Sequence, residues 1–359
     1  MPFYQDIDPK DSHSTRLLER LLALRQQLDA EIPTRTQSET LLLGTWNIRE
    51  FDSPAYGERL PEAIYYIAEI VARFDLVAIQ EVRRDLKAIK KLCAILGGFW
   101  KYIITDITEG NRGNEERLAF LYDTRKVSFG GLASELVLPP LELKDENNKT
   151  IYKPVSQIAR TPFMCGFQAG WTRFILATVH ILYGKNTAND PLRIEEIHQV
   201  AQSLRSRTLD RNAWSHNLIL LGDFNIFSPQ DKTMQALTEV GFIVPPALQN
   251  LPSNAPETKF YDQIAFRVRD DRFATDSQAG IFNYYKSVFR PEDEAIYAPL
   301  IGDAYHITST GKPRKDKTAY YLTYWRTHQM SDHLPMWVEL KIDYSDDYLK
   351  RKMQAATED

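Results

Sequence analysis

The chain contains few cysteines, no long apolar segment and no excess of basic side chains. Only Cys93 and Cys165 occur among its 359 residues, and both have apolar neighbours in the sequence. We expect two buried, reduced thiols, which argues against a small disulfide-stabilised secreted protein. No apolar run approaches the roughly 20 residues that a membrane-spanning helix needs, and residues 1–13 are too polar and acidic for a secretory signal. These absences predict a cytoplasmic protein without a transmembrane segment.

The formal net charge is −4, because 48 acidic side chains outnumber 44 basic ones. A protein that grips nucleic acid through bulk electrostatic attraction is usually basic. Mild acidity still permits a nuclease, since a metal site needs carboxylates and a bound cation reverses the local sign of the charge. The balance therefore predicts few phosphate contacts and modest affinity for nucleic acid.

Polar residues stand at the ends of several apolar runs that are typical of buried strands. The clearest run, residues 218–221, leads through Gly222 into Asp223, Phe224 and Asn225. The spacing of two directs the Asp223 and Asn225 side chains to the same side of an extended backbone. The ends of other apolar runs carry further polar residues, namely Asn47, Gln80, Glu81, His180, Asp262, Asp332 and His333. We expect one rim of a sheet core to gather these side chains into a site.

In this order, the clusters resemble the pattern of the endonuclease/exonuclease/phosphatase superfamily. The resemblance extends from about residue 41 to about residue 340, and the complete set is specific although any one piece is weak. The chain is most similar to the deoxyribonuclease I branch, through Trp-Asn-Ile-Arg at 46–49, Gln-Glu-Val-Arg at 80–83, Glu-Arg-Leu-Ala-Phe at 116–120 and Arg-Thr-Pro at 160–162. That branch carries a disulfide after its Gly-Asp-Phe-Asn segment, whereas residues 226–229 contain no cysteine. This departure favours the cytoplasm over secretion.

The resemblance implies an α/β (α+β) fold, a four-layer α/β/β/α sandwich of two mixed β-sheets. Patterning alone indicates only that strands and helices alternate. A hydrophobic content of 43% allows a chain of this length to bury one large core. We divide the chain into an N-terminal helical extension at 1–40, the family domain at 41–342 with an insertion at about 282–329, and a charged tail at 343–359.

A leucine-rich stripe at helical spacing predicts a helix over residues 14–32. This helix lies before the usual start of the family domain. We expect it to pack on its own domain, and the alternative is a dimerisation helix that joins two copies of the chain. Further helices are predicted over 59–74, 84–96 and 194–209, and the Gly-Gly pair at 97–98 is a good end signal for the helix before it.

The insertion contains a basic run at 312–317, followed by Tyr320, Tyr321, Tyr324 and Trp325. This order suits contacts to a nucleic-acid backbone together with stacking of bases on aromatic rings. The alternative is a solvated loop that leads into an aromatic packing segment.

Hydrolysis of a phosphodiester needs an activated water, a neutralised phosphate and help for the leaving alkoxide. We assign Glu81 as the principal metal ligand, supported by Asn47 and Asp332. These hard oxygen ligands suit Mg²⁺, with Mn²⁺ as the alternative, whereas no Cys/His set in the sequence fits zinc. Asp223 would orient or deprotonate the water, and Asn225 would donate amide N–H groups to the phosphate oxygens.

Two histidines are the candidate acid and base. The resemblance pairs His333 with Asp262 and pairs His180 with Glu116, and the second pair is peculiar to the deoxyribonuclease I branch. One pair would deprotonate the water while the other protonates the leaving oxygen. The sequence does not decide which pair does which.

Arg49, Arg83 and Arg160 match family arginines that line the nucleic-acid face, where guanidinium groups suit phosphates. Because the sequence shows no apolar hairpin for membrane insertion, these arginines favour DNA over a lipid headgroup. We therefore predict a metal-dependent phosphodiester hydrolase, a DNA endonuclease with little sequence preference. The alternatives are a phosphoesterase that acts on a lipid or inositol phosphate, and a non-catalytic nucleic-acid-binding module.

Overall fold

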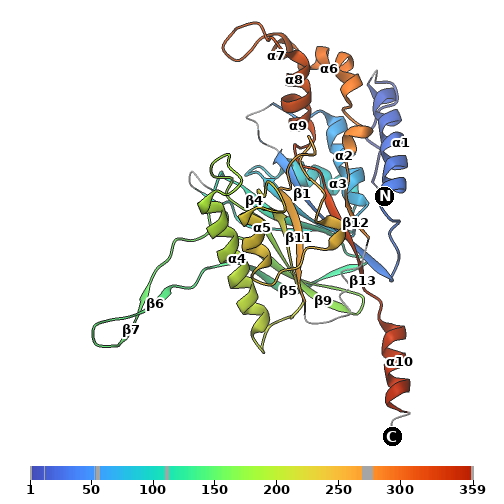
Figure 1. Ribbon diagram of the computed structural model, residues 1–359. Helices are drawn as coiled ribbons and strands as arrows, with labels where there is room; N and C mark the ends of the chain where they lie inside the picture. Colours follow the sequence, from blue (N-terminus) through green and yellow to red (C-terminus); the bar gives the residue numbers. More distant parts are fainter. Residues whose placement is uncertain are drawn as a thin grey trace.

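The computed structural model describes residues 2–11, 13–51, 53, 57–109, 113–268 and 278–356. Two mixed β-sheets pack face to face, and helices cover their outer faces (Figure 1). This arrangement is the four-layer α/β/β/α sandwich that the sequence predicted, so the predicted fold class is confirmed.

The first strand of the family domain lies near the centre of the first sheet. Its strand order is β12 (Ala279–Ile281), β13 (Met336–Lys341), β1 (Thr40–Phe51), β2 (Leu76–Val82), β4 (Arg117–Asp123) and β3 (Trp100–Ile104). β1 runs parallel to β2, with α2 (Pro61–Ala72) as the crossover between them, and the other neighbours are antiparallel. Leu41 and Leu43 belong to the core between the sheets, whereas Leu42 belongs to the core under the helices. This alternation is what a strand with two buried faces requires.

The second sheet has the order β11 (Asp262–Arg267), β10 (Leu218–Asp223), β9 (Thr172–His180), β8 (Phe163–Ala169) and β5 (Val127–Glu135). β9 and β10 are parallel and are joined by α4 (Pro191–Leu209), which covers this sheet together with α5 (Lys232–Thr238). The two strands approach closely at Gly222, where an added Cβ would lie 2.2 Å from the carbonyl oxygen of Val179. The glycine therefore permits the register that sets Asp223 beside His180.

The first helix, α1 (Ser14–Glu31), packs on the rest of its own chain. The inward leucines of the stripe share a core with α2 and α3 (Lys87–Leu96), and they are Leu17, Leu21, Leu24 and Leu28. Leu18 and Leu22 remain exposed. Most of the apolar surface that a dimerisation helix would offer is thus already buried, which favours the first of the two expected alternatives.

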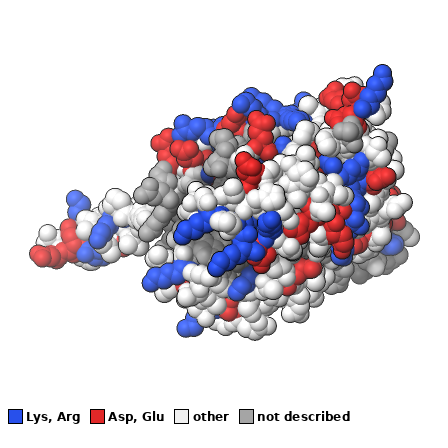
Figure 2. All heavy atoms as spheres, turned by 90° about the horizontal axis from the view of Figure 1, so that it is seen from above, with Lys and Arg blue, Asp and Glu red and all other residues white. Residues whose placement is uncertain are grey.

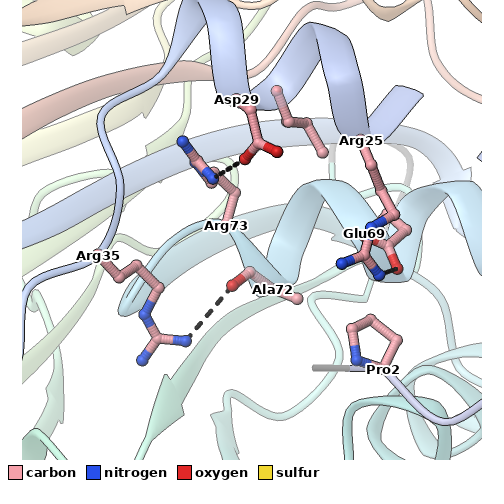
Figure 3. A pocket seen from close by; sticks show the side chains of 8 residues that line it. Pro2, Arg25, Asp29, Arg35, Glu69, Ala72 and Arg73 are labelled. Carbon is pink, nitrogen blue, oxygen red and sulfur yellow. Dashed lines mark hydrogen bonds and ion pairs between the residues drawn. The ribbon is translucent and has the colours of Figure 1, made fainter. Parts of the chain in front are cut away.

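Charged side chains hold α1 to the end of α2 around a small pocket (Figure 3). Arg73 donates a hydrogen bond to Oδ1 of Asp29 at 2.7 Å. Arg25 of α1 lies 3.7 Å from a carboxylate oxygen of Glu69, which belongs to α2. The N-terminal helix is therefore attached through both apolar burial and ion pairs.

Glu69 gives this attachment a pH dependence. Burial raises the pKa of Glu69 to about 7, whereas the carboxyl group of the unfolded chain titrates near 4.5. Because the folded chain holds this proton more tightly, the unfolding free energy should fall as the pH rises from about 4.5 to about 7, by about 3 kcal/mol. Glu69→Gln should remove this decline, so its stability advantage over the wild type should grow from about pH 4.5 and be complete above about pH 7. Urea unfolding over this pH range measures it, and an equal decline in the variant would contradict the assignment to Glu69.

A hairpin of β6 (Leu141–Lys144) and β7 (Thr150–Lys153) projects from the second sheet between β5 and β8 (Figure 1). Leu143 pairs with Ile151, and these side chains are 42% and 45% exposed. The hairpin also carries charged residues, among them Glu142, Lys144, Asp145 and Glu146. The expectation that the chain has no apolar hairpin for membrane insertion therefore stays a prediction. An alternation of only four residues per strand is too short to stand out in the sequence.

The insertion forms a helical layer beside α1 and α2 (Figure 1). Its elements are η3 (Tyr284–Lys286), η4 (Pro291–Asp293), α6 (Glu294–Ile301), α7 (Asp303–His306), α8 (Lys317–Tyr320), the π-helix η5 (Tyr321–Trp325) and α9 (Arg326–Gln329). Tyr321 is buried in the core that contains α1 and α2, and Trp325 packs against that core. Tyr320 and Tyr324 stay at the surface. The aromatic segment is thus partly a packing element and partly accessible.

The remaining elements are the short helical turn η2 (Pro246–Leu248) and α10 (Ser345–Ala355), which lies in the charged tail. The Tyr348 ring of α10 lies 5.7 Å from the Trp171 ring. Cys93 is half-buried in α3, and Cys165 is buried in β8. Within the described part of the chain, no helix is both long enough and apolar enough to cross a membrane.

Candidate active site

Polar strand ends from both sheets meet around one cavity. Its lining includes nine of the residues that the sequence analysis singled out, namely Arg49, Glu81, Glu116, Arg160, His180, Asp223, Asn225, Asp332 and His333. Asn47, Arg83 and Asp262 contact residues of this lining through hydrogen bonds or ion pairs. The structure therefore brings together all twelve candidate side chains.

Irregular backbone shapes the ends of β1 and β2 at this cavity. Their pairing shifts register between Asn47 and Phe51, and Glu50 and Glu81 adopt left-handed φ angles of 49° and 62°. Such angles cost of order 1–3 kcal/mol for residues other than glycine, and they cluster at functional sites. The backbone N–H of Glu50 donates to Oε2 of Glu81 at 2.7 Å, so the bulge fixes the carboxylate in place.

Asp223 is the centre of the hydrogen-bond network. Its Oδ2 atom accepts a hydrogen bond from Nδ2 of Asn47 at 3.0 Å, and its Oδ1 atom accepts one from the backbone N–H of Asn225 at 2.8 Å. The Nε2 atoms of His180 and His333 lie 3.4 Å and 3.7 Å from Oδ2. Two imidazoles from different parts of the chain therefore approach the same carboxylate oxygen.

Each imidazole is held at its other nitrogen by a buried carboxylate. Nδ1 of His180 lies 2.7 Å from Oε2 of Glu116, and Nδ1 of His333 lies 2.8 Å from Oδ2 of Asp262. Burial would lower the pKa of both histidines, but their carboxylate partners together with Asp223 outweigh it and raise both pKa values. Both rings therefore keep a proton to higher pH than a free histidine does.

Arg49 stands on the cavity wall where the insertion meets β1. Its Nη1 atom donates to Oγ1 of Thr327 at 2.6 Å, and its Nε atom lies 3.8 Å from Oδ2 of Asp332. The Asp332 side chain is the most exposed of the predicted metal ligands. This pair is consequently the part of the site that a substrate meets at the surface.

Arg83 and Arg160 are more strongly engaged by the protein itself. Arg83 lies 2.7 Å from Glu50. Arg160 is buried, and its Nε atom donates to the carbonyl oxygen of His180 at 2.8 Å. Burial would raise the pKa of Glu116, but His180 and Arg160 lower it to about 2. Arg160 therefore supports the His180 pair directly, a contact that the sequence could not reveal.

Asn225 follows β10 with φ of 53°, a left-handed angle that asparagine tolerates better than most residues. Its Nδ2 atom donates to the carbonyl oxygen of Ile181 at 2.8 Å. An amide carries two N–H groups, so this bond uses only one of them. The neighbouring Tyr261 ring lies 5.4 Å from the His333 ring and covers one side of it.

Two serines to which the sequence analysis gave no role support the site. Oγ of Ser331 donates to the carbonyl oxygen of Asn47 at 2.6 Å and accepts from the backbone N–H of His333 at 3.0 Å. Oγ of Ser253 donates to Oδ2 of Asp262 at 2.7 Å. Ser331 could have been found, because it opens the Ser-Asp-His segment at 331–333. Ser253 lies in a polar loop without any such signal.

The sequence profile of the Endonuclease/Exonuclease/phosphatase family matches residues 44–333, which include the whole of this site. The chain belongs to the endonuclease/exonuclease/phosphatase family. A curated relative, a deoxyribonuclease from Thioalkalivibrio sp. (strain K90mix), is 30% identical over 207 residues, which cover 55% of this chain. The chain spans about half of that relative, 50% of its length.

Two solved structures show the same fold as this endonuclease/exonuclease/phosphatase family member. The human Nocturnin catalytic domain with bound sulfate anion is 13% identical, with a TM-score of 0.51, and the match covers 84% of this chain and 94% of that one. An endonuclease/exonuclease/phosphatase family protein from Leptotrichia buccalis C-1013-b is 13% identical, with a TM-score of 0.50, and covers 84% and 99% of the two chains. At these identities the likeness concerns the fold alone.

The site of this endonuclease/exonuclease/phosphatase family member contains candidate metal ligands. Ligand atoms lie within 4.8 Å of one another in each of two groups, Glu81 with Glu116 and His180, and Asp223 with Asp262 and His333. The set is dominated by carboxylates, which suits a hard divalent cation.

The predicted ligands Asn47, Glu81 and Asp332 also fit such a cation. Oδ1 of Asn47 is buried and has no hydrogen-bond partner within the described part of the chain. Burial, Glu116 and Asp332 raise the pKa of Glu81, because the site gathers several negative charges. A bound divalent cation would satisfy the orphaned oxygen and neutralise the clustered carboxylates.

Proposed function

We propose that the protein is a metal-dependent DNA endonuclease with little sequence preference, using Mg²⁺ with Mn²⁺ as the alternative. The observation that carries the proposal is the approach of His180 and His333 to the same oxygen of Asp223, at 3.4 Å and 3.7 Å. Cleavage of a diester needs one group to take a proton from water and another to give a proton to the leaving oxygen. Two imidazoles that are held independently meet this requirement.

In the proposed reaction, Asp223 accepts a hydrogen bond from the attacking water and orients it. One imidazole takes the proton of that water, and the other protonates the leaving oxygen as the phosphorus–oxygen bond breaks. Asn225 donates an amide N–H to a non-bridging phosphate oxygen. Asn47, Glu81 and Asp332 would hold the divalent cation, which supplies neutralisation of the phosphate charge.

DNA is the proposed substrate because a deoxyribonuclease is among the relatives and because arginines border the cavity. Arg49 is placed to contact a phosphate at the rim, whereas the engaged side chains of Arg83 and Arg160 contribute positive potential. A lipid or inositol phosphate is the second candidate, and the exposed apolar face of the β6–β7 hairpin favours it.

Nicking of supercoiled plasmid by the purified chain tests the proposal. We expect relaxed circles in Mg²⁺ and in Mn²⁺, and a loss of activity by about a thousandfold or more when EDTA removes the metal. Phosphoinositide and sphingomyelin vesicles serve as parallel substrates. Folded protein that hydrolyses these lipids but leaves plasmid intact would reverse the ranking of the two candidates, and metal-independent DNA binding without nicking would indicate a binding module.

A further inference from the structure

Next to the active-site cavity, the insertion forms a second groove between α7 and the helix that continues from α8 into η5. The groove has a volume of about 790 Å³, and its lining includes Ile307, Thr308, Ser309, Arg314, Tyr320 and Tyr324. This volume lies within the range of small-molecule sites, which are roughly 300–1,000 Å³. The groove combines aromatic and aliphatic surface with hydroxyl groups, one guanidinium group and the carboxylates of Asp303 and Asp316.

A column of stacked side chains joins this groove to the active site. Cζ of Arg314 lies 3.6 Å from the centre of the Tyr320 ring. The Tyr320 and Tyr324 rings stack with their centres 5.2 Å apart and an interplanar angle of 22°. The Tyr324 ring is 5.8 Å from Cζ of Arg49. Because Tyr324 lines the groove and Arg49 lines the active-site cavity, the two hollows share this wall.

The column is fixed relative to the catalytic segment. Tyr324 belongs to η5, and a π-helical turn within an α-helix is rare and frequently marks a functional site. The insertion is also tied to the segment that carries His333, because the hydroxyl oxygen of Tyr284 lies 2.7 Å from the carbonyl oxygen of Ser331 and 2.9 Å from that of His333. Its single hydrogen is donated to this pair of acceptors. A ligand held in the groove would consequently have a fixed position relative to the cleavage site.

Basic residues flank the groove, although its lining also contains two carboxylates and the whole chain is mildly acidic. Between residues 303 and 317 the sequence has four basic residues, Lys312, Arg314, Lys315 and Lys317. Of these, Arg314 lines the groove, together with Asp303 and Asp316. On the molecular face seen from above, basic and acidic groups are interspersed rather than gathered into one basic field (Figure 2). Recognition here would therefore depend on a few local contacts.

We propose that the groove binds unpaired nucleotides of the DNA strand that is cut, on one side of the scissile phosphate. This proposal rests on the proposed endonuclease function and names the form of DNA that the site prefers. Bases in a duplex are paired and stacked on each other, whereas an unpaired strand offers them to aromatic rings and guanidinium planes. Because Arg314 and Tyr324 cover the two faces of Tyr320, a base would stack on the free face of the Arg314 guanidinium. The neighbouring lysines contact the phosphates of the strand, and Arg49 receives the strand at the active site.

Binding of a fluorescein-labelled oligothymidylate, measured by anisotropy in EDTA, tests the groove without any need for hydrolysis. Arg314→Ala should weaken this binding by about tenfold, since one base stacked on a side chain contributes about 1–3 kcal/mol. Tyr320→Ala should weaken it as well, because the Tyr320 ring lies between Tyr324 and Arg314 and supports the guanidinium plane of Arg314. Tyr152→Ala is the matched control, because this tyrosine is 63% exposed on the β6–β7 hairpin. In Mg²⁺, turnover of a small substrate, thymidine 5′-(p-nitrophenyl phosphate), should stay within about twofold of wild type in all three variants, as this ester does not extend into the groove.

Unchanged oligothymidylate affinity in both groove variants would overturn the proposal. A loss of binding to anionic vesicles, with oligothymidylate binding intact, would overturn it in favour of a membrane surface. A loss of small-substrate turnover that matches the loss of binding would also overturn it, because the variants would then damage the whole site. The proposed function fails by a separate result: if the wild type hydrolyses no DNA, weakened binding in the groove variants would still support the groove.

Discussion

Asp223→Asn is expected to lower the rate of phosphodiester hydrolysis by about a thousandfold while the chain still folds. The substitution keeps the shape of the side chain but removes its negative charge. Both oxygens of Asp223 accept from N–H donors, Nδ2 of Asn47 and the backbone of Asn225. An amide in this position must turn its own N–H toward one of these donors, and it offers the attacking water a weaker acceptor.

Initial rates of plasmid nicking in Mg²⁺ measure the effect, and thermal unfolding verifies that the variant is folded. Asp85→Asn is the matched control, because Asp85 is an exposed aspartate that pairs with Lys87 at 2.9 Å on the surface. The control should nick plasmid at the wild-type rate. If Asp223→Asn kept a rate within tenfold of the wild type, Asp223 would not orient the water, and the approach of the two histidines would need another explanation.

Periodic patterns in the sequence were sufficient for the main elements of the fold. The predicted helix over 14–32 is observed as α1 (Ser14–Glu31), and the run before Gly222 is β10 (Leu218–Asp223). Burial of one face is what these elements need, and that need is visible locally as a period of 3.6 or 2 residues. The layer order came from the family resemblance, since patterning alone does not say which sheet a strand joins.

Side-chain partners were beyond the reach of local patterns. His180 and Glu116 are 64 residues apart, and His333 and Asp262 are 71 residues apart, so only the resemblance could pair them. The bonds of Arg160 to main-chain carbonyls depend on how β9 ends, which no spacing in the sequence encodes. The β6–β7 hairpin was not predicted, because strands of four residues are too short to give a periodic signal in the sequence.

Replacing the carboxylate behind each histidine should separate the base from the acid. Glu116→Gln and Asp262→Asn are each expected to lower the nicking rate at neutral pH by about a hundredfold to ten-thousandfold, because each leaves an imidazole without the anion that orients it. Both substitutions also change the pKa of the adjacent histidine. Glu116 raises the pKa of His180 and Asp262 raises that of His333, so removing either carboxylate charge lowers the corresponding pKa.

The direction of the change in the pH–rate profile is therefore the same for both variants, but the limb that moves differs. A histidine that acts as the base works unprotonated, so lowering its pKa moves the acidic limb to lower pH. A histidine that acts as the acid works protonated, so lowering its pKa moves the alkaline limb to lower pH. If Glu116→Gln moves one limb and Asp262→Asn the other, the two imidazoles divide the proton transfers between them. Movement of the same limb in both variants would contradict that division, because both histidines would then serve one proton transfer.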